Sequence, residues 1–361
     1  ERQVSEIQLE HLTVAFPDDT VGLNNLDATV QSGEFLALVG PSGSGKTTLL
    51  RTLAGFLSPT SGTIRIGGRD VSAVPPEHRN MGMVFQQHAV WPHMTVEANV
   101  AYPLKQAKVP ASQRRSRVEE VLELVGLAGY GARKPDSLSG GQRQRVALAR
   151  AIVARPSVLL LDEALSALDE PLRDGLRREL VALTRTHNLT TVHVTHDRKE
   201  ALAIADRIAV LRDGVIEQIA APADLLARPA SAWVASFMGD ATVLPGRING
   251  GRVVVDSLPE LSWPAELSGT AAADGTEVEV AVRPSMVHLD GAGHDGATAT
   301  AMTMIVTSAL YERDGYSVSL RAGDHEFRAF APGSARPEID TAAVVRIDPP
   351  LVFASTPKEQ E

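Results

Sequence analysis

The sequence predicts an α/β domain with a mainly parallel sheet and a helical insertion, followed by a smaller all-β domain. Three observations support this. Short apolar runs such as Phe35–Val39 and Val158–Leu161 are typical of buried parallel strands. Between about residues 95 and 154 the apolar residues recur at helical spacing. After about residue 240, short alternating segments are separated by Asp-Gly turns, a pattern typical of antiparallel strands.

Composition narrows the class of protein. The 361 residues predict two or three domains at roughly 150 residues each. The net charge is −9 with no long basic tract, so nucleic acid is not an expected partner. The chain has no cysteine, which excludes disulfides, thiolate metal sites and cysteine nucleophiles. No apolar run reaches the ~18 residues that span a bilayer and no signal peptide is recognisable, so we expect any membrane role to require a partner.

The elements of the first domain follow from local patterns. Up to about residue 86 the chain reads as short strands, and the strand at Phe35–Val39 leads through a glycine-rich turn into a helix that ends at Gly55. In the insertion, a helix is indicated by an apolar stripe of Val118, Val121, Leu122, Leu124 and Val125.

Strands and helices alternate again from residue 158. Pro171 is a favourable first residue for a helix whose apolar side consists of Leu172, Leu176, Leu180 and Leu183. The segments that follow predict a strand at Thr190–Thr195, a helix at Arg198–Asp206 and a strand at Arg207–Leu211.

Residues beyond 240 alternate in the manner of half-buried strands, for example at Arg252–Asp256, Glu277–Val282 and Tyr316–Leu320. We therefore expect a first domain at residues 1–238, with the helical insertion at about 87–155, and a small β-barrel domain at 239–361.

The most informative motif follows Phe35–Val39. The spacing of Gly40, Gly45, Lys46 and Thr47 fits the phosphate-binding pattern G-x-x-x-x-G-K-[ST]. Glycines let successive N–H groups face a polyphosphate, and the helix N-terminus adds the positive end of its dipole. Lys46 is placed to reach the β- and γ-phosphates, and the Thr47 hydroxyl to hold Mg²⁺. The predicted ligand is a nucleoside triphosphate bound by Gly40, Pro41, Ser42, Gly43, Ser44, Gly45, Lys46, Thr47 and Thr48.

A second element of the phosphate site ends the apolar strand at Val158–Leu161. Asp162, at the end of a buried strand, is placed to bind Mg²⁺ through water. Glu163 beside it is suited to polarise an attacking water as general base. Taken alone, the pair also fits a solvated strand end, but with the phosphate loop upstream it indicates a nucleotidase.

The third element is Leu138-Ser139-Gly140-Gly141-Gln142, before an apolar helix. A serine and two glycines at a helix start form a second anion site or an ordinary N-cap. About twenty residues later comes the strand that ends in Asp162-Glu163. This combination resembles the signature of the ATP-binding cassette family over about residues 5–235, which implies ATP as the nucleotide.

The resemblance implies further roles, residue by residue. Phe16 lies where the family has an aromatic residue that stacks on adenine, although a lone Phe near a strand is more often part of a core. Gln86, after Met83-Val84-Phe85, matches the glutamine that contacts Mg²⁺ and the attacking water, with Gln87 as an alternative one residue later. Ser166–Asp169 matches the loop that crosses a dimer interface, and His196 matches the switch histidine that contacts the γ-phosphate.

Two neighbouring residues qualify these assignments. His193 lies two residues before Thr195, on the same face by strand alternation, and is a plausible decoy for His196. Ala164 replaces the proline that the family commonly has after Asp-Glu. This change frees the backbone at the turn without removing a chemical group, so we expect hydrolysis to survive with looser positioning of Glu163.

The mechanism that the resemblance implies is a head-to-tail homodimer. Each ATP then lies between Gly40–Thr48 of one chain and Ser139–Gln142 of the other. Lys46, Mg²⁺ and the opposed helix N-terminus neutralise the γ-phosphate, Glu163 serves as base, and hydrolysis reopens the dimer.

The segment Gln87–Thr95 resembles the stretch of importer ATPases on which a membrane permease docks. Phe237–Asp240, Leu244–Gly246 and Val282–Pro284 resemble the C-terminal oligonucleotide-fold-like domain of the same importers, with Ser285 in place of the usual glutamate. We therefore expect a peripheral subunit on the cytoplasmic face of the membrane, with permease subunits as partners and a solute-binding protein as an indirect one.

The importer group handles sugars, polyamines, ferric iron, sulfate and phosphonates, and the sequence leans toward the iron, polyamine and phosphonate branch. Two alternatives stay open. A soluble cassette ATPase of nucleic-acid or ribosome work typically has two cassettes or a coiled-coil insertion, and neither is found here. An exporter ATPase usually lacks the β domain.

Overall fold

The computed structural model describes residues 5–86, 89–165, 170–269, 272–289, 299–312, 314–334 and 336–355. The chain forms two compact units, residues 1–223 and 224–361. The sequence placed the division after residue 238, at the end of the helix α8 (Ala232–Gly239). In the structure, Ala235 of α8 packs against Ala281 of the second unit, so the helix is part of that unit.

The first unit is built on a six-stranded sheet with the order β10-β9-β3-β8-β7-β6. β10 is antiparallel to β9, and the other pairs are parallel. All residues of β3, β7 and β8 are buried, which explains why they read as uninterrupted apolar runs. The strands are β3 (Phe35–Val39), β6 (Met81–Val84), β7 (Val158–Asp162), β8 (Thr190–Val194), β9 (Arg207–Arg212) and β10 (Val215–Ala220).

Helix α1 (Lys46–Ala54) packs between this sheet and a second, antiparallel sheet. Its buried residues Leu49, Leu50 and Leu53 share one core with apolar residues of both sheets. The antiparallel sheet has the order β2-β1-β4-β5, with β1 (Ile7–Ala15), β2 (Val21–Val30), β4 (Ser61–Ile66) and β5 (Arg69–Asp70).

Arg79 fixes the C-terminal end of α1. The guanidinium is buried and donates to the carbonyl oxygens of Thr52 and Leu53 at 2.7 and 2.8 Å, and to that of Val74 at 2.7 Å. A cation at this end of a helix satisfies its last carbonyls and complements its dipole. The short helix η1 (Pro76–His78), which precedes Arg79, is thereby tied to the element that begins at the phosphate loop.

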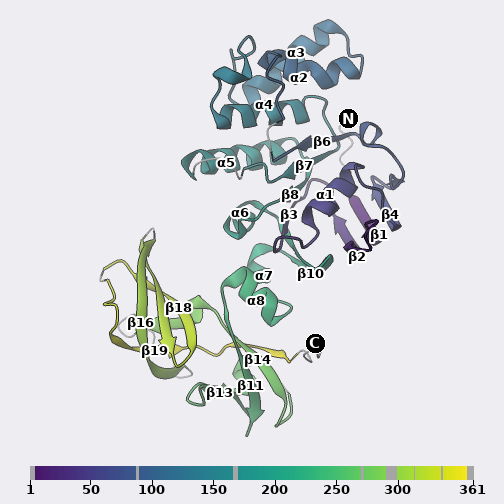
Figure 1. The fold of residues 1–361 in the computed structure, drawn as a ribbon. Coiled ribbons are helices and arrows are strands. Elements are labelled where there is room, and N and C mark those ends of the chain that lie inside the picture. Colours follow the sequence, from purple (N-terminus) through teal and green to yellow (C-terminus); the bar gives the residue numbers. More distant parts are fainter. Residues whose placement is uncertain are drawn as a thin grey trace. The chain divides into compact units, whose positions relative to one another are not determined.

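The helical insertion lies between β6 and β7, as predicted. It contains α2 (Val96–Gln106), α3 (Ala111–Leu124), η2 (Pro135–Ser137) and α4 (Gly140–Ile152). Figure 1 shows α2, α3 and α4 together on one side of the parallel sheet, away from β1, β2 and β4. In the predicted apolar stripe of α3, Val118, Val121 and Leu122 are buried. Leu124 is 40% exposed, so its inclusion in the stripe was wrong.

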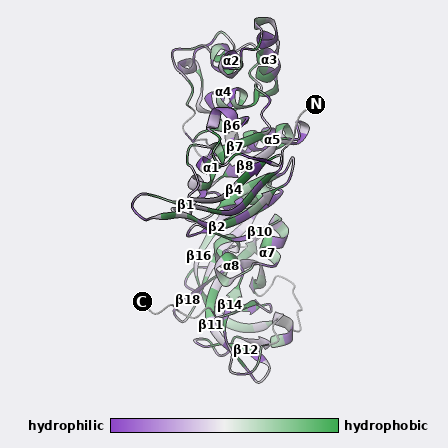
Figure 2. Cartoon of the chain, turned by 90° about the vertical axis from the view of Figure 1, so that its right-hand side faces the viewer, coloured by the Kyte–Doolittle hydropathy of each residue, from purple (hydrophilic) through white to green (hydrophobic). Residues whose placement is uncertain are grey.

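Helices α5 (Glu170–Thr186) and α6 (Arg198–Ile204) follow β7 and β8. α5 begins one residue before the predicted start at Pro171, and α6 ends two residues before the predicted end at Asp206. Hydrophobic and hydrophilic residues occur on the same helix in α3 and α5 (Figure 2), as one-sided burial requires. No helix of the described segments is both long and apolar enough to cross a membrane.

The second unit is all β apart from its short helices, which confirms the predicted fold class. Two five-stranded antiparallel sheets, β13-β12-β11-β14-β20 and β15-β19-β16-β17-β18, enclose one apolar core. Buried Trp263 joins them, because its indole N–H donates to the carbonyl oxygen of Ile347 at 3.0 Å.

The strands of this unit are β11 (Thr242–Asn249), β12 (Arg252–Val255), β13 (Ser262–Pro264), β14 (Glu277–Val282), β15 (Val287–Leu289), β16 (Thr300–Glu312), β17 (Gly315–Ala322), β18 (His325–Pro332), β19 (Ala342–Ile347) and β20 (Leu351–Ala354). Besides α8, its short helices are η3 (Ala265–Ser268) and η4 (Pro284–Met286), and α7 (Pro222–Ala227) lies at the division between the units.

Candidate active site

The phosphate loop depends on glycine at positions where another residue would not fit. Gly45 caps α1 with φ of 100° in the left-handed region. A Cβ atom at Gly45 would lie 2.5 Å from the carbonyl oxygen of Gly22, a backbone atom that cannot move aside. The loop therefore presents its N–H groups at the start of α1 without side chains in the way.

Lys46 folds back over the loop. The side chain is buried, and Nζ donates to the carbonyl oxygens of Gly40 at 2.9 Å and Pro41 at 2.7 Å, with the Ser44 hydroxyl at 3.3 Å. Burial lowers the pKa of Lys46, and the nearby carboxylate of Glu163 opposes this effect. The positive charge thus lies inside the loop that is predicted to hold phosphates.

The loop borders a cavity of about 310 Å³. Seven of its lining residues are consecutive in sequence, and the eighth is His196, which follows β8. The lining consists of Ser42, Gly43, Ser44, Gly45, Lys46, Thr47, Thr48 and His196. The structure therefore brings the predicted switch histidine to the predicted phosphate loop.

Two side chains hold the carboxylate of Glu163. Gln86 Nε2 donates to one oxygen at 2.7 Å, and His196 Nε2 contacts the other oxygen. Glu163 has φ of 47°, and its N–H donates to the carbonyl oxygen of Val194. Gln86 is thus the glutamine placed at Glu163, while the alternative residue Gln87 lies outside the described residues.

The order of the strands explains this meeting point. β6, β7 and β8 are adjacent and parallel, so the residues that follow them emerge at the same edge of the sheet. Asp162 ends β7 and is almost fully buried. Burial and the neighbouring carboxylate of Glu163 raise the pKa of Asp162. Ala164, in place of the usual proline, packs in the apolar core behind this edge.

Ser139–Gln142 forms a complete capping box at the start of α4. The Ser139 hydroxyl accepts from the Gln142 N–H, and the Ser139 N–H donates to Gln142 Oε1 at 3.0 Å. None of these residues lines the cavity at the phosphate loop. The structure therefore does not bring this predicted binding segment to the loop within one chain.

The remaining predicted residues lie in different surroundings or outside the described residues. Phe16 is part-buried. Its ring lies beside Gly22, close to Thr48 of the loop, since a Cβ atom added to Gly22 would contact both side chains. Asp169 lies outside the described residues. His193, the possible decoy for His196, is completely buried, and its Nε2 contacts Glu200. Glu200 and its partner Arg177 had not been predicted, because only the fold brings these distant residues together.

Comparison with known proteins shows which family the sequence resembles. A family model described as ABC transporter matches residues 23–166. The spermidine/putrescine import ATP-binding protein PotA of Marinobacter nauticus is 41% identical over 340 residues, covering 88% of this chain and 91% of that protein. The sulfate/thiosulfate import ATP-binding protein CysA of Mycobacterium bovis is 45% identical over 311 residues, covering 84% and 88%. The Fe(3+) ions import ATP-binding protein FbpC of Photobacterium profundum is 40% identical, covering 85% and 86%.

Among solved structures, the dimeric bacterial ABC transporter cassette MJ0796 matches with a TM-score of 0.54 and 32% identity, covering 60% of this chain and 98% of that chain. A second dimeric structure of that cassette, in a post-hydrolysis state with ADP and Pi, matches equally well at 31% identity.

Fold, phosphate loop and relatives together define an ABC-type ATPase. The chain belongs to the ABC transporter family, as one of its import ATP-binding subunits.

Gly45→Ala provides a test of the loop geometry. We expect it to weaken ATP binding about 10-fold or more, because the new Cβ collides with a backbone carbonyl and the left-handed conformation is strained. Titration with a fluorescent ATP analogue measures this. The matched control is Gly129→Ala, which carries similar strain (φ 77°) but has no atom within 4 Å of the new Cβ. Equal affinity in both variants would contradict the proposed role of the loop.

Proposed function

We propose that this chain hydrolyses ATP in a head-to-tail dimer and couples hydrolysis to solute uptake through a membrane permease. The observation that carries the catalytic part is the carboxylate of Glu163, held by Gln86 and His196 beside the cavity at the phosphate loop.

ATP binds with its phosphates on the loop Gly40–Thr48. The backbone N–H groups at the start of α1 and the charge of Lys46 neutralise the phosphates. On binding, Nζ of Lys46 exchanges its contacts with loop carbonyls for the β- and γ-phosphate oxygens. Phe16, on the flank of the loop, stacks on the adenine.

The oxygen atoms present at the site fit Mg²⁺, which prefers hard oxygen ligands. Thr47 lines the cavity, Asp162 ends the neighbouring strand, and Gln86 supplies an amide oxygen. Burial and the adjacent carboxylate of Glu163 raise the pKa of Asp162, and a cation bound here would offset this cost of ionising Asp162. When bound, the metal supplies charge neutralisation at the phosphate oxygens.

Glu163 acts as the general base that takes a proton from the attacking water. Gln86 fixes the orientation of its carboxylate, and His196 changes its partner from Glu163 to the γ-phosphate when ATP enters the cavity. Positioning of the water and neutralisation of the phosphate provide most of the catalysis in this type of reaction.

The second half of each site comes from another copy of the chain. Ser139–Gln142 has an intact helix N-terminus but lies away from the loop cavity of its own chain. A partner that offers this segment to the γ-phosphate completes the anion site, with Asp169 at the interface. The similar cassette MJ0796 is described as dimeric.

The docking surface for the permease is a groove of about 360 Å³ between β6 and the helical insertion. Trp91 packs on Tyr102 at 4.6 Å between ring centroids, and Arg150 lies over the Trp91 ring at 4.5 Å. Phe85 is partly exposed in the same groove, one residue before Gln86. An apolar, aromatic groove next to a catalytic residue is suited to a helix of a permease, which would hold the chain at the cytoplasmic face.

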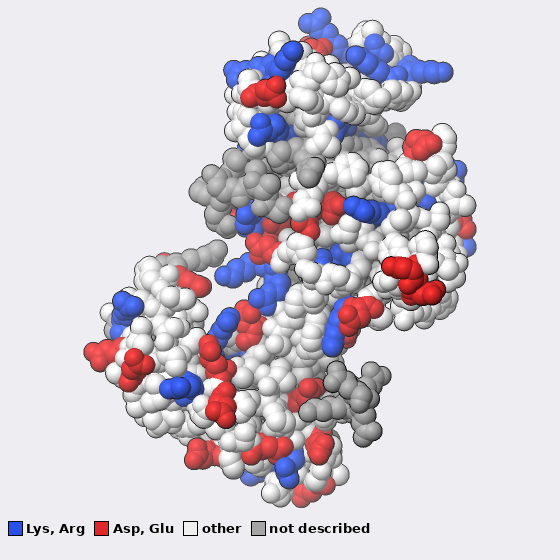
Figure 3. Space-filling model, viewed as in Figure 1, with Lys and Arg blue, Asp and Glu red and all other residues white. Residues whose placement is uncertain are grey.

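The charge distribution agrees with a protein partner. On the face in Figure 3, acidic and basic side chains are interspersed, and a group of Lys and Arg side chains lies on the helical insertion. The solute is selected by the permease and its binding protein, and the relatives suggest a polyamine, ferric iron or sulfate. Polyamine and ferric iron also belong to the branch that the sequence favours.

Glu163→Gln tests the catalytic role. We expect phosphate release to fall about 100-fold or more, because the amide cannot accept the proton, while ATP still binds. The ATP-bound dimer then accumulates, and gel filtration with ATP detects it. A variant that turns over ATP at the parent rate would contradict the assignment of the base.

Trp91→Ala tests the docking groove. We expect the isolated subunit to keep its basal ATPase rate but to lose co-purification with the permease encoded beside its gene. The control is Leu310→Ala, which truncates an exposed apolar residue of the second unit. If Trp91→Ala and the control both retain the permease, the groove is not the docking site.

A further inference from the structure

A buried polar network lies directly behind His196. His193, in β8, is completely buried, and its Nε2 lies 2.5 Å from Oε1 of Glu200 in α6. The ring of Phe35 packs edge-on against the imidazole, with 6.0 Å between the two ring centroids. Glu200 is 3% exposed, so this carboxylate and this imidazole contact each other almost without solvent.

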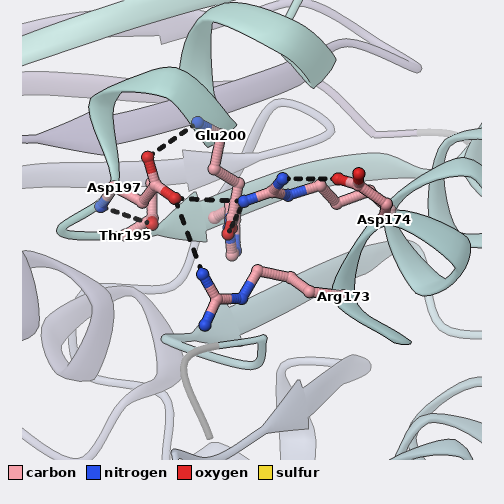
Figure 4. Close-up of polar contacts among 7 residues, drawn as sticks. Arg173, Asp174, Thr195, Asp197 and Glu200 are labelled. Carbon is pink, nitrogen blue, oxygen red and sulfur yellow. Dashed lines mark hydrogen bonds and ion pairs between the residues drawn. The ribbon is translucent and has the colours of Figure 1, made fainter. Parts of the chain in front are cut away.

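Two arginines of α5 connect to the same network (Figure 4). Arg177 donates to Glu200 Oε2 at 3.3 Å, to Asp197 Oδ2 at 3.1 Å and to Asp174 Oδ1 at 2.8 Å. Arg173 forms an ion pair with Asp197 at 3.9 Å. Burial raises the pKa of Glu200, but the hydrogen bonds and charges of His193 and Arg177 outweigh this, and the net pKa is below its usual value.

The contacts define which ring nitrogen of His193 faces Glu200. Glu200 is an ionised acceptor, so Nε2 carries the proton, and Nδ1 has no hydrogen-bond partner among the described residues. His193 therefore acts as a fixed donor to Glu200, whose charge is balanced by Arg177.

Both neighbours of His196 are held by hydrogen bonds. On one side, the Thr195 hydroxyl accepts from the Asp197 N–H at 3.0 Å. On the other, Asp197 caps α6 by accepting from the Glu200 N–H at 3.1 Å. The turn that carries His196 is thus anchored to α6, and α6 is anchored to β8 and α5 through Glu200.

We propose that His193, Glu200 and Arg177 are positioning residues that hold the turn at His196 in the geometry needed to reach Glu163 and the γ-phosphate. This inference rests on the proposed function. Buried charges are an expensive way to stabilise a core, and apolar residues of similar volume would serve stability as well. Their value here is geometric, since a displacement of about 1 Å at a catalytic group costs roughly 100-fold in rate.

His193→Phe provides the test, because it keeps the volume and the contact with Phe35 but removes the donor to Glu200. We expect kcat for ATP to fall about 10- to 100-fold, with the affinity for ATP changed less than about two-fold. His193→Gln keeps an N–H donor and should recover a large part of kcat. Thermal melting of each variant shows whether it is folded at the assay temperature.

The matched control is Glu34→Gln. Glu34 is also a buried carboxylate, paired with Arg207 at 3.2 Å, but it lies at the start of β3, the opposite end of the strand from the phosphate loop. The Glu34→Gln substitution should lower the melting temperature and leave kcat at the parent value. Glu200→Gln is a second test variant, since it weakens the contact between His193 and residue 200 by changing the acceptor instead of the donor.

The outcomes separate the two proposals. If the parent protein does not hydrolyse ATP, the proposed function fails. If the parent is active and His193→Phe retains its kcat, or loses kcat only in proportion to a loss of folded protein, the positioning role is overturned. A drop in kcat that His193→Gln reverses supports it.

Discussion

The placement of the Glu163 carboxylate is the constraint on which the site depends. One oxygen is held by Gln86, which follows β6, and the other by His196, which follows β8. Neither residue is near Glu163 in sequence, so only adjacent parallel strands on both sides of β7 bring them together. β3, the next strand beyond β8, delivers the phosphate loop to the same edge. A different strand order would separate Glu163 from the loop Gly40–Thr48.

The surrounding structure supports this edge from two directions. Arg79 fixes the far end of α1, so the helix whose first residues form the phosphate loop is held at both ends. Behind His196, the contacts among His193, Glu200 and Arg177 fix the start of α6. In each place an arginine lies where backbone or carboxylate acceptors converge. Arg79 is buried and Arg177 is 11% exposed, and shielding such a charge from water is costly unless its contacts are made.

Much of this could be read from the sequence, because local patterns determine it. Apolar runs predicted the buried strands, and the spacing of Gly40, Gly45 and Lys46 predicted the loop. Gln86 and Gln87 could not be separated by spacing alone; the structure shows the contact of Gln86 with Glu163, while Gln87 lies outside the described residues. The role of His193 was also beyond the sequence, since alternation gives a face but not the burial of both faces.

The division between the units was placed after α8 from a change in composition. The helix itself is apolar and gives no local sign of which unit it packs on. Its packing on Ala281 is a long-range contact and could be seen only in the fold. The same holds for Arg177, which meets Asp197 and Glu200 twenty or more residues away.

In the proposed dimer, each chain carries halves of two different ATP sites. The chain has no cysteine, so single cysteines can be introduced cleanly at Ser42 and at Gly140, where a Cβ meets no atom within 4 Å. The two variants are mixed, each with Glu163→Gln added, and treated with a short bifunctional thiol reagent. We expect a cross-link between Ser42→Cys of one chain and Gly140→Cys of the other, and we expect it to require ATP. A mixture that gives no such product, or gives it equally without ATP, would contradict it.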